Sequence, residues 1–344
     1  MKKRIFHLLL ALCMALSLMP NAASAENLLD EVSSGESVTK ADIDRLVVSG
    51  KSLKINGGDG VKLVFDTEAL KEIAKQTSEY IKVAIEDVTA EYQHSRAGKK
   101  VFFLAVFAED KTVYNFKGKA AVTLPYEPNE GENAENVTVW YLTNSGIAIE
   151  IPIEYDAETN FITFEVTHFL LYMVGIDGYI NPFEDVGEND WYYMDVKAVK
   201  QNNLFVGTDL TTFSPDSTMT REMLWTVLGR VDGSQKLYGE GAFESAREWA
   251  MGAGITDGKS PKGYITREQI ATMLWRYAGK PDAGCNLSRF SDAVNISDYA
   301  RDAMAWAVEN GIILGYDGAL MPKDCATRAE AAAIMRRFIE VAIK

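Results

Sequence analysis

Cysteine and histidine are scarce in this 344-residue sequence, with three of each. Beyond the N-terminal segment only Cys285 and Cys325 remain, too few for a disulfide framework, and whether they pair or stay as free buried thiols is open. The remaining histidines, His94 and His168, have no Cys or His partner at metal-ligand spacing. The sequence therefore predicts neither a bound metal nor a cofactor.

Positive charge is also in short supply, because 35 Lys and Arg face 49 Asp and Glu, for a net charge of -14. The first 25 residues carry three basic residues and no acidic one, so the remainder has a net charge of -17. A chain this acidic repels phosphate backbones. Nucleic acid is therefore not an expected partner.

Long apolar runs are confined to the N-terminus. Basic residues 2–4 precede an apolar run from Ile5 to Met19, and Ala23-Ser24-Ala25 follows as a small-x-small cleavage site. This order is typical of a secretory signal peptide over residues 1–25. No later stretch is long and apolar enough to span a bilayer, so we expect an exported protein without a transmembrane segment.

Residues 26–44 are polar and acidic, and we expect a flexible lead-in there. Residues 45–178 show short apolar or alternating stretches separated by turn residues, which predicts a β-sandwich-like domain. One short helix is expected at 67–75, with Thr67 as its cap. The expected strands are 46–49, 61–65, 81–88, 101–107, 120–124, 137–142, 147–153, 161–166 and 170–174.

The last third of this β domain, from Val122 through Ile153 to Tyr172, resembles β modules that often precede anchoring repeats in clostridial surface proteins. The resemblance rests on the order and spacing of short motifs such as Thr167-His168-Phe169. It implies no chemistry for the domain.

Three Thr-Arg pairs each introduce an apolar run, at Thr220, Thr266 and Thr327. Thr is a favoured N-cap, and Glu330 or Gln269 three residues later completes a capping box in two of the copies. The pattern predicts three helix starts.

In every copy the residue after the cap is Arg, where the positive end of the helix dipole favours an acid. A cation in that place requires a nearby anion. The anion is either a neighbouring Glu or a ligand that carries carboxylate or phosphate, which a guanidinium at a helix N-terminus can bind in a bidentate manner.

These helix starts belong to an internal repeat. Phe183-x-Asp185 leads to Thr220 in the first copy, and Phe290-x-Asp292 leads to Thr327 over the same distance in the third. The middle copy lacks the Phe-x-Asp start and has a shorter loop. The expected boundaries are 179–232, 233–283 (degenerate) and 284–344.

The recurring order and spacing resemble an S-layer homology triplet. The resemblance implies an all-α fold in which three repeats share one core with pseudo-threefold symmetry. It also implies grooves that bind secondary cell-wall polysaccharide, often with acidic pyruvate ketals. By match to the family motif, the implied binding residues are Arg221, Arg267, Arg328, Asp185 and Asp292.

Aromatic residues add two candidates for a stacking surface, Trp191 and Tyr299, at corresponding helix starts, although core packing is an equal alternative. Trp249 and Trp306 lie on an apolar helix face and are expected in the core. No nucleophile-elbow or phosphate-loop motif occurs, so the sequence predicts no enzyme.

The sequence as a whole predicts a multidomain surface protein of a Gram-positive-type bacterium, held on wall polysaccharide by its C-terminal repeats. The alternatives are a self-assembling S-layer subunit, a tethered adhesin and, least favoured, a tethered enzyme.

Overall fold

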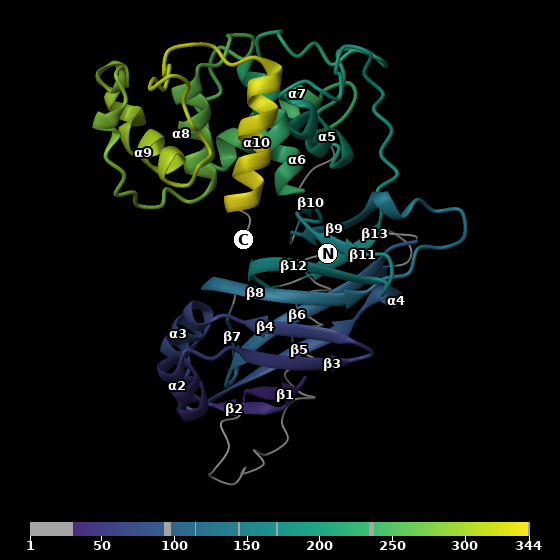
Figure 1. Cartoon of the computed structure of the whole chain (residues 1–344). Coiled ribbons are helices and arrows are strands. Elements are labelled where there is room, and N and C mark those ends of the chain that lie inside the picture. The colour runs from purple at the N-terminus through teal and green to yellow at the C-terminus, as the bar shows by residue number, and fades with distance from the viewer. Residues whose placement is uncertain are drawn as a thin grey trace. The chain divides into compact units, whose positions relative to one another are not determined.

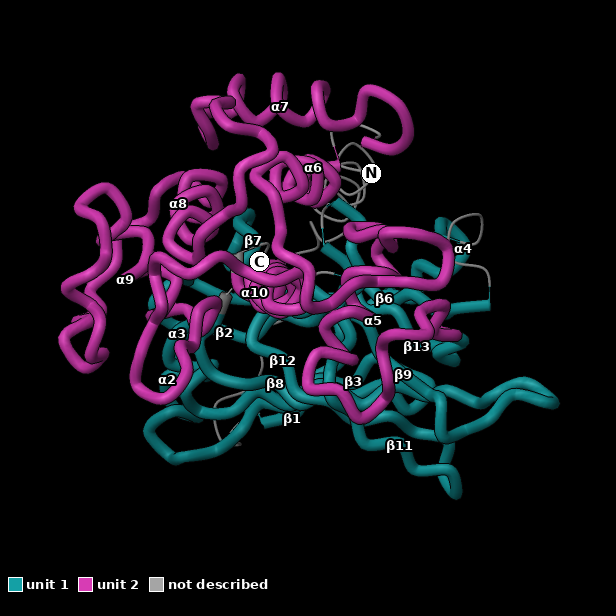
Figure 2. The backbone as a smooth tube through the Cα atoms, turned by 90° about the horizontal axis from the view of Figure 1, so that it is seen from above, with its two compact units in different colours: residues 1–178, 344 teal, residues 179–343 magenta. Residues whose placement is uncertain are grey.

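The computed structural model describes residues 30–92, 98–113, 115–143, 145–169, 171–233 and 237–342. The chain divides into two compact units, residues 1–178 with 344 and residues 179–343 (Figure 2). The expected signal peptide lies outside the described residues. Within the described part, no helix has the length and apolar character needed to cross a membrane.

The first unit contains a six-stranded sheet in the order β1-β3-β4-β8-β12-β11 (Figure 1). Strand β1 runs parallel to β3, and the other pairs are antiparallel. The strands are β1 (Glu31–Ser33), β3 (Leu53–Gly58), β4 (Val61–Phe65), β8 (Asn115–Pro125), β11 (Glu154–Asp156) and β12 (Phe161–His168).

A seven-stranded sheet forms the second layer, in the order β10-β9-β13-β6-β5-β2, with β7 paired to β6. One hydrophobic core includes buried residues from both sheets. Across the layers, the Phe164 and Tyr172 rings lie 5.4 Å apart between centroids. The strands are β2 (Ser37–Thr39), β5 (Tyr80–Asp87), β6 (Lys100–Ala108), β7 (Lys111–Val113), β9 (Val137–Leu142), β10 (Ala148–Ile151) and β13 (Leu171–Ile176).

The N-terminal end of this unit and its helices correct three expectations. The described part of the lead-in is not an irregular segment but β1, β2 and the start of a helix, α2 (Lys40–Ser49). That helix replaces the strand expected at 46–49. Besides α2 and the expected helix α3 (Thr67–Gln76), the unit contains α4 (Thr89–Tyr92) and a 3₁₀ turn η1 (Ala134–Asn136), so one helix was too few.

The end signals of α2 explain the error. The Thr39 side chain accepts a hydrogen bond from the Asp42 backbone N–H, and Gly50 closes the helix in the left-handed region with φ 68°. Ile43 and Leu46, three residues apart, supply the buried face. Helix α3 begins as expected, but its cap is Asp66, which accepts from the Ala69 N–H, and not Thr67.

The second unit consists of helices joined by loops and 3₁₀ turns. The helices are α5 (Tyr193–Gln201), α6 (Arg221–Asp232), α7 (Ala242–Gly252), α8 (Arg267–Tyr277), α9 (Arg301–Glu309) and α10 (Arg328–Ala342); the turns are η2 (Leu287–Arg289), η3 (Ala293–Asn295) and η4 (Asp298–Ala300). Helix α6 packs on α7, α8 on α9, and α10 on α5. Each Thr-Arg helix therefore packs on the first helix of another of the three expected copies, and these contacts form a closed cycle.

Candidate functional site

Helices α6, α8 and α10 begin at the three Thr-Arg pairs, as predicted. Thr327 accepts from the Glu330 N–H at 3.2 Å while Glu330 accepts from the Thr327 N–H at 2.9 Å, which confirms the capping box. The Thr266 N–H donates to Gln269 Oε1 at 3.2 Å. In the first copy Thr220 accepts from the Met223 N–H at 3.4 Å.

Each of the three arginine side chains reaches into a loop of another copy. Arg328 Nε donates to the Phe213 carbonyl at 2.7 Å, and its Nη2 donates to the Val206 carbonyl at 2.7 Å. Arg267 Nε donates to the Leu320 carbonyl at 2.9 Å. Arg221 Nε donates to the Lys259 carbonyl at 3.0 Å. We call these three places the Arg328, Arg267 and Arg221 junctions.

The backbone closes the same cycle. The Met219 N–H donates to the Ala326 carbonyl, the Ala326 N–H to the Ile265 carbonyl, and the Ile265 N–H to the Met219 carbonyl, each at 3.0 Å. These residues directly precede the three capping threonines. The ring joins the three helix starts to one another, so each junction depends on the other two.

The junctions differ in their carboxylate partners. Arg221 pairs with Asp257 at 3.1 Å, and Arg267 lies 3.7 Å from Glu330. Arg328 has no carboxylate within 4.0 Å among the residues that the structure describes, although it is only 6% exposed. Its guanidinium lies 4.6 Å from the Phe213 ring centroid.

Burial lowers the pKa of Arg328, and the more distant Asp185 opposes that shift. Even so, the guanidinium stays charged at any ordinary pH. A nearly buried cation without a carboxylate contact favours binding of an anion, so the Arg328 junction is the strongest candidate for a ligand site.

Asp185 and Asp292 position the loops that receive the arginines. Asp185 accepts from the Phe213 N–H at 2.7 Å and from the Ser214 N–H at 2.6 Å. Asp292 accepts from the backbone N–H groups of residues 320 and 321 at 2.8 and 2.7 Å. Because both carboxylates bind main-chain donors, these two predicted site residues hold the carbonyls in place for Arg328 and Arg267.

The degenerate middle copy makes a substitute arrangement. Asp257, on the loop itself, accepts from the Lys259 N–H at 3.1 Å and also pairs with Arg221. Those two contacts hold the pKa of Asp257 below its ordinary value, the Lys259 N–H contributing most. One residue thus both orders the loop and contacts the arginine.

The two candidate stacking residues are on the surface. Trp191 is 64% exposed and contacts Tyr192 edge-on, and Tyr299 is 53% exposed. Trp306 is buried against Phe338, as a core residue should be, whereas Trp249 is only partly buried and packs on Tyr277.

Glu268, directly after Arg267, is a residue of the site that sequence reasoning did not single out. Its carboxylate is 3% exposed and accepts from Lys323 Nζ at 2.7 Å, the Ser297 N–H at 3.0 Å, Ser297 Oγ at 2.9 Å and Tyr299 OH at 3.0 Å. Burial raises its pKa, but the donors from Lys323, Ser297 and Tyr299 together outweigh burial and the net shift is downward. Glu268 is therefore a buried, ionised carboxylate.

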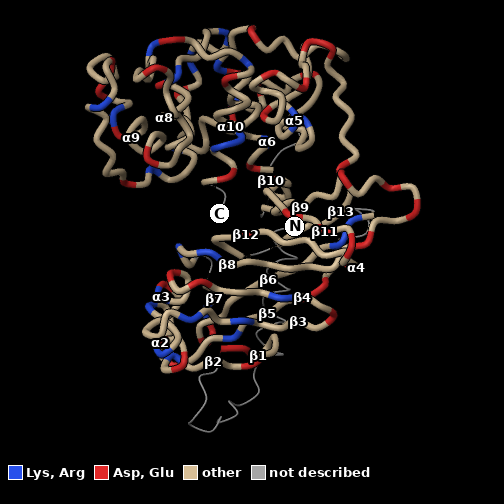
Figure 3. Tube along the Cα trace, viewed as in Figure 1, with Lys and Arg blue, Asp and Glu red and all other residues tan. Residues whose placement is uncertain are grey.

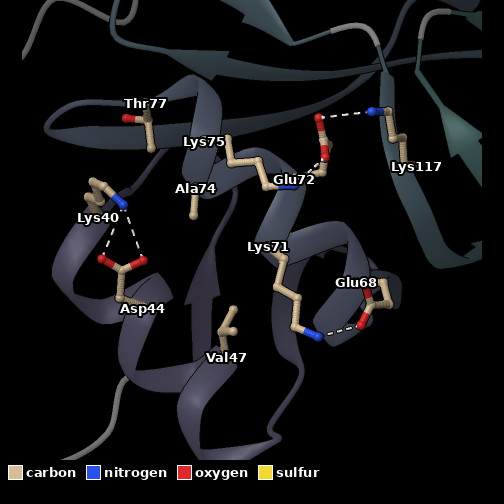
Figure 4. A pocket seen from close by; sticks show the side chains of 10 residues that line it. All are labelled: Lys40, Asp44, Val47, Glu68, Lys71, Glu72, Ala74, Lys75, Thr77 and Lys117. Carbon is tan, nitrogen blue, oxygen red and sulfur yellow. Dashed lines mark hydrogen bonds and ion pairs between the residues drawn. The ribbon is translucent and has the colours of Figure 1, made fainter.

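A separate pocket of about 850 Å³ lies in the first unit, beside α2 and α3 (Figure 4). Basic and acidic residues both occur along these two helices (Figure 3). Four lysines line the pocket, and each has a carboxylate partner within it; the pairs are Lys40–Asp44, Lys71–Glu68, Lys75–Glu72 and Lys117–Glu72. Lys75 and Lys117 share Glu72, so four lysines face three carboxylates, and each lysine already has an acidic partner.

Neither cysteine forms a disulfide, and Cys325 is exposed, so the alternative of two buried thiols is wrong for that residue. His168 lies at the end of β12, where its ring centroid is 4.5 Å from that of Tyr141, and His94 falls outside the described residues. No group of three potential metal ligands occurs among the residues that the structure describes.

Comparison with known proteins gives three informative relatives. The chain is 26% identical over 326 residues to an amylopullulanase of Thermoanaerobacterium thermosulfurigenes, covering 88% of this chain and 17% of the relative. It is 30% identical over 175 residues to an endoglucanase of Bacillus sp. (strain KSM-635), covering 46% and 19%. It is 26% identical over 168 residues to the surface-layer 125 kDa protein of Lysinibacillus sphaericus, covering 48% and 10%.

These relatives contradict the prediction that the chain is not an enzyme. Two of the three are enzymes by name, and the amylopullulanase match is too long to lie in the second unit alone. The chain spans at most 19% of the length of these relatives.

The family comparison locates the repeated motifs. The S-layer homology domain model matches residues 182–222 and 289–332, which include the helix starts of α6 and α10. Together with the surface-layer relative, this match associates the chain with the bacterial cell surface. The protein thus contains S-layer homology sequence in its second unit.

Proposed function

We propose that this protein is exported and attaches to secondary cell-wall polysaccharide through three S-layer homology repeats, displaying its two-sheet unit at the surface of a Gram-positive-type bacterium. The matched stretches at 182–222 and 289–332 support the first and third repeats. Two contacts support a second repeat: Arg221 donates to the Lys259 carbonyl, and Arg267 donates to the Leu320 carbonyl. The closed cycle also supports a pseudo-threefold arrangement.

The observation that carries the proposal is the Arg328 junction. Among the described residues, its buried guanidinium donates hydrogen bonds only to carbonyls, so its positive charge is not balanced by contact with an acid. The carboxylate of an acidic sugar substituent, such as a pyruvate ketal, would supply the negative charge that balances it. Trp191, exposed in the copy that Arg328 contacts, offers an apolar face for a sugar ring.

Arg221 is proposed to contribute in the same way at its own junction. Arg267 and Tyr299 match the same motif positions, but Tyr299 already donates to the Glu268 carboxylate, so these two are not proposed as contacts to an acidic ligand. Asp185 and Asp292 contribute by positioning the loops. Self-association of the displayed unit into a lattice, and a role as an adhesin, are the alternatives.

Co-sedimentation of the full chain with wall sacculi tests the proposal. We expect binding that disappears when the non-peptidoglycan polymer is stripped, and that weakens with added salt. Trp191→Ala should weaken binding about tenfold, or about 1.4 kcal/mol. Val48→Ala, an exposed apolar residue in the other unit, should leave it unchanged. Equal binding to stripped and intact sacculi would refute attachment through the polymer.

The amylopullulanase match favours a second candidate function, in which the first unit hydrolyses or binds a polysaccharide. An alignment that covers 88% of this chain must include much of residues 1–178. Incubation of the full chain with a panel of soluble polysaccharides, followed by a reducing-end assay and by affinity electrophoresis, distinguishes hydrolysis from binding. If the chain released no reducing ends and no polysaccharide retarded it, display at the surface would remain as the role of this unit.

A further inference from the structure

The residue that follows the arginine differs among the three junctions: Glu222, Glu268 and Ala329. Ala329 is buried, and its methyl group introduces no charge. Glu222 is half-buried, and none of the described residues forms a hydrogen bond or ion pair with its carboxylate. Glu268 alone is surrounded by donors.

Those donors come from one copy, and the carboxylate comes from another. Ser297, Tyr299 and Lys323 belong to the third copy and surround the carboxylate of Glu268 from the second. We call these three donor residues the Glu268 cage. An ammonium, two hydroxyls and a backbone N–H are the groups that bind the carboxylate of an acidic ligand.

The corresponding positions at the Arg328 junction hold neither the acid nor the base. Counting from the capping threonines, Lys323 corresponds to Asp216, as Glu268 corresponds to Ala329. The same count gives Glu222 and Lys262 at the Arg221 junction, so an acid and a base occupy these positions there as well as at the Arg267 junction, and both are absent at the Arg328 junction. Among the described residues, only Glu268 contacts its lysine. At the Arg267 junction the Glu268 carboxylate is held by donor groups of the same chain, as an acidic ligand would be held by its binding site.

We propose that the Glu268 cage is a carboxylate-binding site that the protein fills with its own side chain. Glu268 occupies it in place of an acidic ligand, so the Arg267 junction is closed to such ligands. Its consequence for wall binding rests on the proposed function: the acidic polymer binds at the Arg328 junction and not at the Arg267 junction.

Removing the Glu268 carboxylate tests the proposal, because added acetate should then bind to the empty cage. In the full-length Glu268→Ala variant, the cage residues keep their donors but lack an acceptor. Acetate that binds only the folded state raises Tm in a saturable manner. We expect this rise in Glu268→Ala with sodium acetate, relative to sodium chloride at equal ionic strength, and none in the unsubstituted chain.

Two variants serve as controls. Glu222→Ala removes the corresponding carboxylate where there is no cage, and Glu268→Gln keeps the cage filled with a neutral side chain. Neither should respond to acetate. An equal response of all variants, or none in Glu268→Ala, would overturn the proposal.

Titration of Glu268 by NMR covers the case in which Glu268→Ala does not fold. In the unsubstituted chain the pKa of Glu268 should lie below the ordinary Glu value of 4.5, and Lys323→Ala should raise it. An ordinary pKa that Lys323→Ala leaves unchanged would show that the cage does not hold the carboxylate. These readouts need no wall polymer, so loss of sacculus binding with an intact acetate response refutes wall attachment alone.

Discussion

Arg328 joins the third copy to the first. Its guanidinium joins two carbonyls, those of Val206 and Phe213, which are more than 100 residues away in the sequence. A buried acceptor that loses its donor costs about 1–3 kcal/mol. The side chain therefore has a structural role whether or not a ligand also binds it.

Replacement of Arg328 by Ala should lower the free energy of unfolding of the helical unit by about 2–4 kcal/mol, since two carbonyls lose their donor. Urea unfolding followed by circular dichroism measures the change. Arg301→Ala is the matched control, because Arg301 is 54% exposed and its one ion pair within the described part of the chain is with the exposed Asp298. A loss in Arg328→Ala no larger than in this control would show that the carbonyl contacts contribute little.

The three arginines also show how far a sequence can predict a site. The mismatch between arginine and helix dipole predicted an anion beside each arginine, and Arg221 and Arg267 have a carboxylate within 4.0 Å. Arg328 has none among the described residues, and its acceptors are main-chain carbonyls of distant loops, which carry no sequence signal. The Glu268 cage did leave a signal, because Glu268 with Lys323 and Ala329 with Asp216 differ together between copies, but only the packing cycle shows which positions to compare.

Among the elements of the first unit, β8 and the start of α3 approach unusually closely. Gly118 lies so near the cap of α3 that an added Cβ would come within 2.0 Å of the Ala69 backbone nitrogen and 2.5 Å of Asp66 Oδ1. Asp66 joins the two elements further, because it accepts from the Lys119 N–H at 3.0 Å as well as capping the helix. The absent side chain at residue 118 thus permits the helix to dock on the strand.

Gly118→Ala should therefore destabilise the first unit by about 1–3 kcal/mol, the usual effect of overpacking, because the opposing atoms are backbone and cannot rotate away. Thermal unfolding monitored on this unit gives the change. Gly178→Ala is the control in the same unit, with no atom near its Cβ, and should stay within about 0.5 kcal/mol. Similar midpoints for both variants would mean that α3 can shift away from β8.

Strand-level prediction succeeded where alternation was strong and failed at short or capped segments. Strands β4 and β9 have the predicted bounds, and α3 extends one residue beyond its predicted end. The apolar Leu46-Val47-Val48 run belongs to a helix, because Thr39 and Gly50 supply end signals that outweigh a β-branched pair. Three-residue strands such as β1 and β7 contain too few residues to show a period.

At the scale of the whole molecule, the second unit differs from an open array of repeats. In an open array each repeat contacts only its neighbours, and the loss of a terminal copy leaves the others folded. Here α10 packs on α5, and the ring of backbone hydrogen bonds requires Met219, Ile265 and Ala326 together. The first and last copies are therefore as dependent on each other as adjacent ones.

A chain that ends at Gly279 tests this closure. It lacks α9 and α10, so α5 loses the helix that packs on it, α8 loses α9, and both Arg328 and the Leu320 carbonyl that binds Arg267 are gone. Because both sides of the remaining pair α6–α7 are then exposed, we expect the whole helical unit to unfold, while the two-sheet unit keeps its own core and its thermal transition. Circular dichroism and limited proteolysis report the two units separately, and the β transition serves as the internal control. Protease-resistant helices from the first two copies would show that the contacts act pairwise and that closure of the cycle is not needed for folding.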